Sequence, residues 1–94
     1  NKKMDKQVII KGISFKGKFP INFSFDKKPG VYIVANPKNK IADIGETENL
    51  KERISIYKKN KNWSVWYCDE TSQKARQKIK RFISEKYHFI QAQV

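Results

Sequence analysis

The stretch GVYIVANPKNKIADIGETENLKER, residues 30–53, decides the fold. Its apolar, β-branched run at 31–35 predicts a strand. The polar segment 36–39 has the composition of a turn. Residues 40–45 predict a second strand, which is most simply antiparallel to the first because the connection is so short.

The apolar spacing then changes from that of a strand to that of a helix. Leu50, Ile54 and Tyr57 recur at i, i+4 and i+7, which places them on one side of a helix. Thr47 or Glu48 is expected to cap this helix, whose first turn is acidic. The order strand, turn, strand, helix is therefore set within 28 residues, 30–57.

The flanking segments predict further strands and a second helix. Two alternating runs, 7–15 and 19–25, predict an N-terminal hairpin that turns at 16–18. Residues 63–68 predict another strand, and 69–72 begin a helix whose core stripe is Ala75, Ile79, Phe82 and Ile83. Residues 87–94 predict a short final strand. The fold class is α+β, a mostly antiparallel sheet flanked by helices.

Length and charge bound the function. The chain has 94 residues and a net charge of +12, so we expect one domain over 1–94 and a polyanionic or acidic partner. Nucleic acid, an acidic protein and an anionic membrane surface are the candidates. The membrane ranks last, because no helix combines a basic face with a broad aromatic face. Without a run of 18 apolar residues or a signal core, the expected location is cytoplasmic.

Cysteine and histidine usage excludes several kinds of site. Cys68 and His88 are the only residues of their types, so neither an internal disulfide nor a zinc site is expected. No nucleophile motif accompanies His88 to form a triad.

The motifs of residues 30–57 resemble those of the GIY-YIG nuclease superfamily. Gly30-Val31-Tyr32 stands where the family has Gly-Ile/Val-Tyr, and Asp43-Ile44-Gly45 stands for its Tyr-Ile/Val-Gly. The helix then carries Asn49-Leu50 and, three residues later, Arg53. Tyr57 follows where the family has His or Tyr. The resemblance implies a GIY-YIG-like core over 29–88, with 1–28 as an added basic arm and hairpin.

The resemblance implies a site for phosphodiester chemistry. In this family a single Mg²⁺ or Mn²⁺, held by a helix Glu, stabilises the phosphate charge while a Tyr helps to deprotonate water. An Arg clamps the scissile phosphate. Carried over by motif, these roles make Tyr32, Asp43, Arg53 and Tyr57 the candidate catalytic residues.

Two departures from the family pattern bear on activity. The second family Tyr is Asp43, and alignment on Tyr87 puts Lys80 at the position of the metal-binding Glu. A lysine ammonium repels a divalent ion. A substitute metal site would need Asp43 with Glu46 or with Glu85.

Nucleic-acid binding is therefore expected, with DNA favoured over RNA, and the sequence leaves open whether the domain also cuts. The expected phosphate contacts are basic residues of the loop after the first helix and of the second helix: Lys58, Lys59, Lys61, Arg76 and Lys80. The alternatives are an active metal-dependent endonuclease with a displaced carboxylate, and a protein-interaction module. An exposed aromatic cluster within 19–25 would favour the interaction module.

Overall fold

A computed structural model describes residues 8–10 and 12–86 and contains one five-stranded sheet and two helices. In chain order the elements are β1 (Val8–Ile10), β2 (Ile13–Pro20), β3 (Gly30–Ala35), β4 (Ile41–Thr47), α1 (Leu50–Ser55), β5 (Ser64–Asp69) and α2 (Gln73–Lys86). The strand order is β1-β2-β5-β3-β4, and all neighbours pair antiparallel. The predicted α+β class is confirmed. The strand expected at 87–94 lies outside the described residues.

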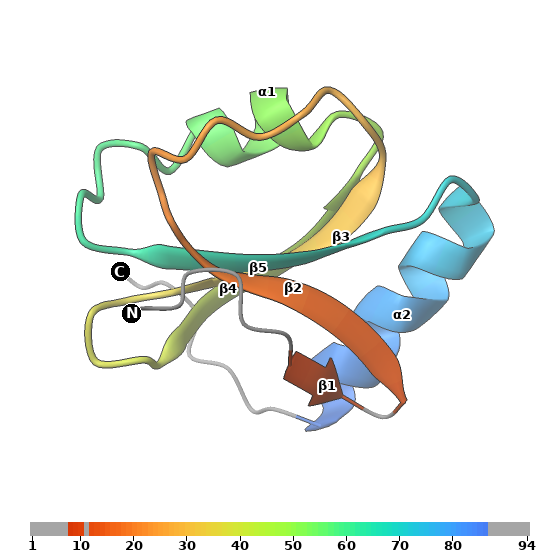
Figure 1. Cartoon of the computed structure of the whole chain (residues 1–94). Coiled ribbons are helices and arrows are strands. Elements are labelled where there is room, and N and C mark those ends of the chain that lie inside the picture. The colour runs from red at the N-terminus through yellow and green to blue at the C-terminus, as the bar shows by residue number, and fades with distance from the viewer. Residues whose placement is uncertain (1–7, 11, 87–94) are drawn as a thin grey trace.

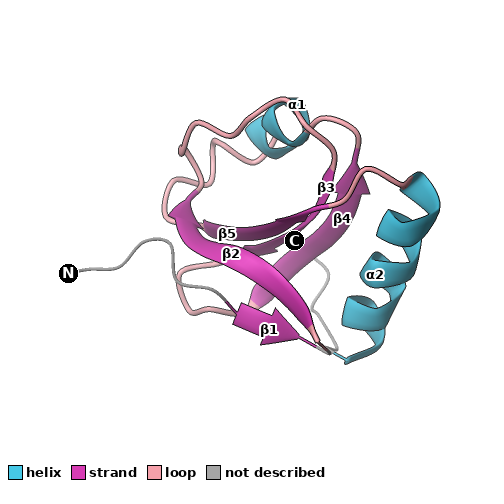
Figure 2. Ribbon diagram, turned by 45° about the vertical axis from the view of Figure 1, so that its right-hand side comes forward, coloured by secondary structure: helices cyan, strands magenta, loops and turns pink. Residues whose placement is uncertain are grey.

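The sheet separates two apolar clusters, one beneath each helix (Figures 1 and 2). Leu50 and Ile54 of α1 pack with Tyr32 and Val34 of β3 on the first face. On the second face Ile83 of α2 packs with alternate residues of β3, namely Val31 and Ile33. This division follows from the period of two along a strand, which sends successive side chains to opposite faces.

The predicted N-terminal hairpin exists, but its turn and its second strand were placed wrongly. The chain reverses at Gly12, whose φ of 82° suits glycine, rather than at 16–18. Residues 16–18 lie inside β2, which ends at Pro20. The alternating run up to Phe25 is therefore mostly a loop. The alternation continues because Ile21 and Phe25 of this loop join Phe19 of β2 in the first cluster.

The first helix begins at a different cap from the one predicted. Asn49 is the N-cap, and its side-chain oxygen accepts a hydrogen bond from the Glu52 backbone N–H at 3.1 Å. Thr47 supports this turn, since its hydroxyl oxygen accepts from the Asn49 N–H at 3.0 Å. The helix ends at Ser55, so Tyr57 lies just beyond it.

A buried ion pair joins α2 to the sheet. Arg76 is 1% exposed, and its Nε donates to Glu46 Oε1 at 2.7 Å. Its Nη1 donates to the backbone carbonyls of Glu70 and Thr71 at 3.1 and 3.0 Å. The guanidinium is thus neutralised and hydrogen-bonded at the start of α2, where an unpaired charge would be costly.

Removal of one partner of this pair should strongly lower the stability of the fold. Glu46→Gln leaves the Arg76 charge buried and unpaired, so we expect a loss of about 3–5 kcal/mol in the free energy of unfolding. The exposed pair Lys16–Asp69, 3.4 Å apart, supplies the control, since Lys16→Ala should cost about 1 kcal/mol or less. Urea unfolding measures both, and equal losses would contradict the structural role of Arg76.

Candidate phosphate-binding site

Three motif residues from three segments meet on the α1 face of the sheet. Tyr32 lies on β3, opposite Gly45 in the β4 register. Asp43 comes from β4, and Tyr57 comes from the turn after α1. The Tyr57 hydroxyl donates a hydrogen bond to Asp43 Oδ2, and the Tyr32 and Tyr57 hydroxyl oxygens are 3.4 Å apart. The structure therefore brings the two predicted tyrosines and the variant aspartate into contact.

The glycines of the two motifs make room for this cluster. A Cβ on Gly45 would collide with the hydroxyl and ring of Tyr32. A Cβ on Gly30 would collide with the Cys68 carbonyl and would lie 2.9 Å from Leu50 Cδ1. A neighbouring group approaches each glycine too closely for any side chain to fit. This explains why the Gly-x-Tyr and x-Ile-Gly patterns have glycine at these positions.

A β-bulge turns Asp43 toward the tyrosines. Simple strand alternation would put Asp43 on the same face as Ile41. In the structure Val34 pairs with Asp43 but Ala35 pairs with Ile41, so Ala42 is an extra residue. Ile41 consequently packs against the cluster under α2, and Asp43 faces α1.

Burial keeps the tyrosine hydroxyls protonated. The Tyr32 side chain is 2% exposed, and burial raises its pKa, an effect opposed by Tyr57 and by the nearby Arg53 charge. Burial also raises the pKa of Tyr57, and its hydrogen bond to Asp43 adds to the shift. Because Tyr57 donates to Asp43, the proton between the two tyrosines comes from Tyr32. Both groups are neutral donors rather than phenolate bases.

Arg53 is the exposed member of the site. It lies in the last turn of α1 and lines a shallow hollow with Thr47, Glu52 and Ile56. Its positive charge lowers the Tyr32 pKa, against the larger effect of burial. The role of Arg53 at this site stays a prediction.

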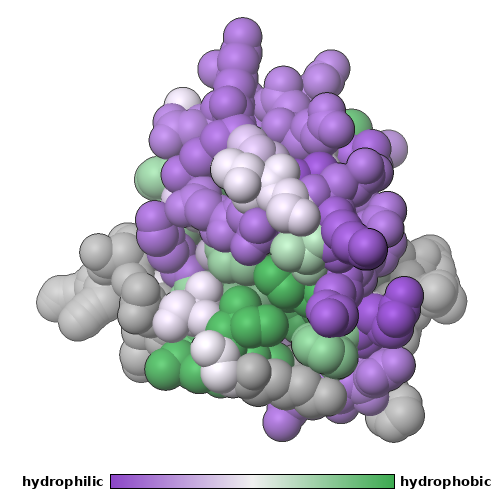
Figure 3. Space-filling model, turned by 90° about the vertical axis from the view of Figure 1, so that its right-hand side faces the viewer, coloured by the Kyte–Doolittle hydropathy of each residue, from purple (hydrophilic) through white to green (hydrophobic). Residues whose placement is uncertain are grey.

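The other predicted contacts lie elsewhere. Arg76 was assigned to the outer, phosphate-binding surface of the second helix, but it is buried against Glu46. The signal was present in the sequence, since Arg76 falls on the same helical stripe as Ile79 and Ile83. Lys80 is exposed on α2, across the sheet from the tyrosines. Figure 3 views the α2 side, where hydrophilic side chains dominate above a patch of apolar ones.

The loop after α1 carries the remaining basic candidates. Lys58, Lys59 and Lys61 are exposed in the turns that follow the helix. Lys58 lines a hollow beside α1, whereas Lys61 lines a different hollow with Lys18 and Trp63.

The residues present do not fit the divalent cation that the GIY-YIG resemblance implies. Asp43 with Glu46 was one candidate substitute pair, but these residues are three apart on β4 and project to opposite faces. Glu85, the other candidate partner, lies on α2, which covers the face opposite Asp43. Asp43 already accepts from Tyr57 and from the Ile44 N–H, and Glu46 is held by Arg76. Within residues 8–10 and 12–86, no group of three or more His, Cys, Asp or Glu side chains could hold a metal ion.

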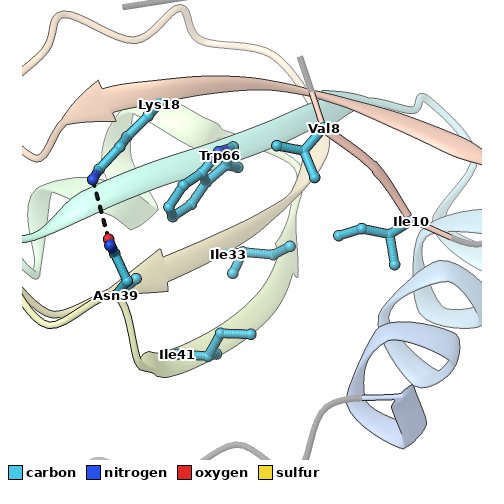
Figure 4. A pocket seen from close by; sticks show the side chains of 8 residues that line it. Val8, Ile10, Lys18, Ile33, Asn39, Ile41 and Trp66 are labelled. Atoms are coloured by element: carbon cyan, nitrogen blue, oxygen red, sulfur yellow. Dashed lines mark hydrogen bonds between the residues drawn. The ribbon is translucent and has the colours of Figure 1, made fainter. Parts of the chain in front are cut away.

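An apolar hollow of about 300 Å³ lies on the opposite face from the tyrosines (Figure 4). Trp66, Ile33 and Ile41 line it, and the Lys18 ammonium donates to Asn39 Oδ1 at 3.1 Å at one end. The sheet separates this hollow from Arg53. The hollow is therefore not part of the candidate phosphate-binding site.

Two further sequence expectations concern partners. An exposed aromatic cluster at 19–25 would have favoured a protein-interaction module, but Phe19 and Phe25 are buried and Phe23 is 40% exposed. Within the described residues, no helix is long and apolar enough to cross a membrane.

Comparison with known proteins gives one short match. A segment of 37 residues is 51% identical to UvrABC system protein C of Petrotoga mobilis, and it makes up 39% of this chain and 6% of that protein. No protein-family model matches the chain, and no solved structure matches it. The match links part of this chain to a small part of a UvrABC system protein.

Ionisation of Tyr57 should make folding stability pH-dependent in the alkaline range. Its pKa is raised in the folded state from the ordinary value of 10.0, so above about pH 10 the folded state retains a proton that the unfolded state loses. The free energy of unfolding of the wild type should therefore fall as the pH rises through this range. Tyr57→Phe should show a shallower fall in urea unfolding between pH 8 and 11. Parallel curves for the two proteins would contradict the assignment.

Proposed function

We propose that this chain is a nucleic-acid-binding domain, with DNA as its expected ligand, in which Arg53 holds a backbone phosphate without hydrolysing it. The observation that carries the proposal is an exposed arginine at the end of α1, four residues before Tyr57, whose neutral hydroxyl contacts both Asp43 and the buried Tyr32. An arginine fork matches the geometry of a phosphate group and stays charged at every relevant pH.

The proton states around Arg53 support binding over cleavage. Tyr57 donates to Asp43, and its raised pKa prevents it from acting as a phenolate base near neutral pH. The Asp43 carboxylate already accepts hydrogen bonds from two donors, the Tyr57 hydroxyl and the Ile44 N–H. Among the described residues the site therefore offers a cation and a hydrogen-bond network in which Tyr57 and Asp43 are already engaged.

The sequence relationships and the net charge support a nucleic acid as the ligand. The GIY-YIG resemblance and the match to a UvrABC system protein both favour a nuclease-related, DNA-related role. A charge of +12 on 94 residues supplies the long-range attraction to a polyanion.

The first test measures binding and cutting of labelled single- and double-stranded DNA. Wild-type binding should weaken steeply between roughly 50 and 200 mM salt, because phosphate contacts release counterions. Arg53→Ala should lose about 1.5–3 kcal/mol of binding free energy, roughly ten- to a hundredfold in affinity. Arg81→Ala, which removes an exposed arginine of α2, is the matched control and should bind like the wild type.

The same DNA is incubated with Mg²⁺, with Mn²⁺ and with EDTA. We expect intact DNA in all three conditions. Metal-dependent cutting that Arg53→Ala abolishes would overturn the binding-only proposal in favour of an endonuclease with a displaced carboxylate. Absence of both binding and cutting would turn attention to an acidic protein partner.

Asp43→Asn distinguishes a binding site from a catalytic one. In a binding site, removal of a negative charge near the phosphate should leave affinity unchanged or raise it by up to about tenfold. Asparagine keeps an oxygen that can accept from Tyr57, so the fold should be retained. A loss of affinity, or the loss of a cutting activity, would assign Asp43 a direct role that the proposal denies.

A further inference from the structure

A polar groove on the outer side of α1 gathers three lysines from separate segments. Lys27 comes from the loop before β3, Lys51 from the first turn of α1 and Lys58 from the turn after it. The groove has a volume of about 340 Å³, and its other lining residues are Asn49, Glu52 and Ser55.

These lysines have no carboxylate of their own within the described chain. All three are exposed, and none takes part in a salt bridge among residues 8–10 and 12–86. The nearby acids Asp26 and Asp69 are engaged by Lys28 at 3.8 and 2.9 Å. Glu52 is the one carboxylate among the residues that line the groove, so three cations outnumber one anion there and the groove favours a negatively charged ligand.

The groove adjoins the Arg53 site. Glu52 lines both the lysine groove and the hollow that contains Arg53, so the two depressions share a wall on α1. A nucleic-acid strand carries a phosphate at every nucleotide, so one strand can reach both hollows. The lysines of α2, in contrast, lie on the helix that covers the opposite face of the sheet.

We infer that the groove of Lys27, Lys51 and Lys58 binds the phosphates that neighbour the one held by Arg53, so that the nucleic-acid backbone runs across α1 rather than along α2. This inference rests on the proposed function and adds the path of the strand. Lys27 and Lys51 thereby become phosphate contacts beside Lys58. Glu52, between the two hollows, is the one carboxylate that opposes this path.

The test compares two triple variants with equal charge loss. The first is Lys27→Gln, Lys51→Gln, Lys58→Gln on α1 and its flanks, and the second is Lys74→Gln, Lys78→Gln, Lys80→Gln on α2, where all three lysines are exposed. Fluorescence anisotropy with a labelled DNA duplex and a labelled single strand gives the affinity at several salt concentrations. Far-UV circular dichroism confirms that each variant is folded.

The α1 variant should lose affinity by about a hundredfold near 0.1 M salt, and its slope of log affinity against log salt should fall by about one for each phosphate contact. The α2 variant should keep a slope close to that of the wild type. Glu52→Gln should bind more tightly than the wild type, by up to about tenfold, because the opposing charge is removed.

The failures are distinguishable. If the wild type binds and Arg53→Ala weakens it, but the α2 variant loses more affinity than the α1 variant, the inferred path is overturned while the proposed function stands. Equal losses in both triple variants also overturn it, because they reflect net charge alone. If the wild type binds no DNA at any salt concentration, the proposed function itself fails.

Discussion

Burial of β3 on both faces is the constraint on which the rest of the structure depends. Every residue from Gly30 to Ala35 is buried, with β4 and β5 as its hydrogen-bonded neighbours. Strand alternation then sends Tyr32 to one cluster and Ile33 to the other, and each cluster needs its own helix as a cover. The close fit extends to the neighbouring backbone, where Gly30 and Gly45 admit Leu50 and Tyr32.

Charged residues have different roles on the two faces of the sheet. On the α2 face, Glu46 and Arg76 neutralise each other in a buried pair that anchors the helix. On the α1 face, Arg53 is exposed and Asp43 is occupied by Tyr57, so a cation remains available at the surface. Because the first pair uses Glu46 for packing, the carboxylate that could have accompanied Asp43 is on the wrong side of the sheet. The same alternation that builds the core thus argues against a metal site at β4.

Three of the lysines are gathered around one groove beside α1. Lys16 and Lys28 are partly satisfied by Asp69, whereas the lysines around α1 face a shared groove without a carboxylate partner of their own. A polyanion that approaches this face meets Arg53 and three ammonium groups on one helix and its flanking turns. Long-range attraction follows from net charge, and the proposed position of the contact follows from the groove that these lysines share.

Local pattern was sufficient for much of this protein, and tertiary contact was needed for the rest. The sequence by itself determined the α+β class, the strands of residues 30–47 and both helices, because periodicity and motif spacing act over short ranges. It misplaced the turn of the hairpin and the end of its second strand, since the alternation that includes Phe19 of β2 continues through Ile21 and Phe25 in the loop that follows. Only the tertiary structure decided that a bulge at Ala42 turns Asp43 toward Tyr57 and that Arg76 is buried against Glu46. Those facts depend on register and on which face meets which helix, and neither is encoded in the spacing of a single segment.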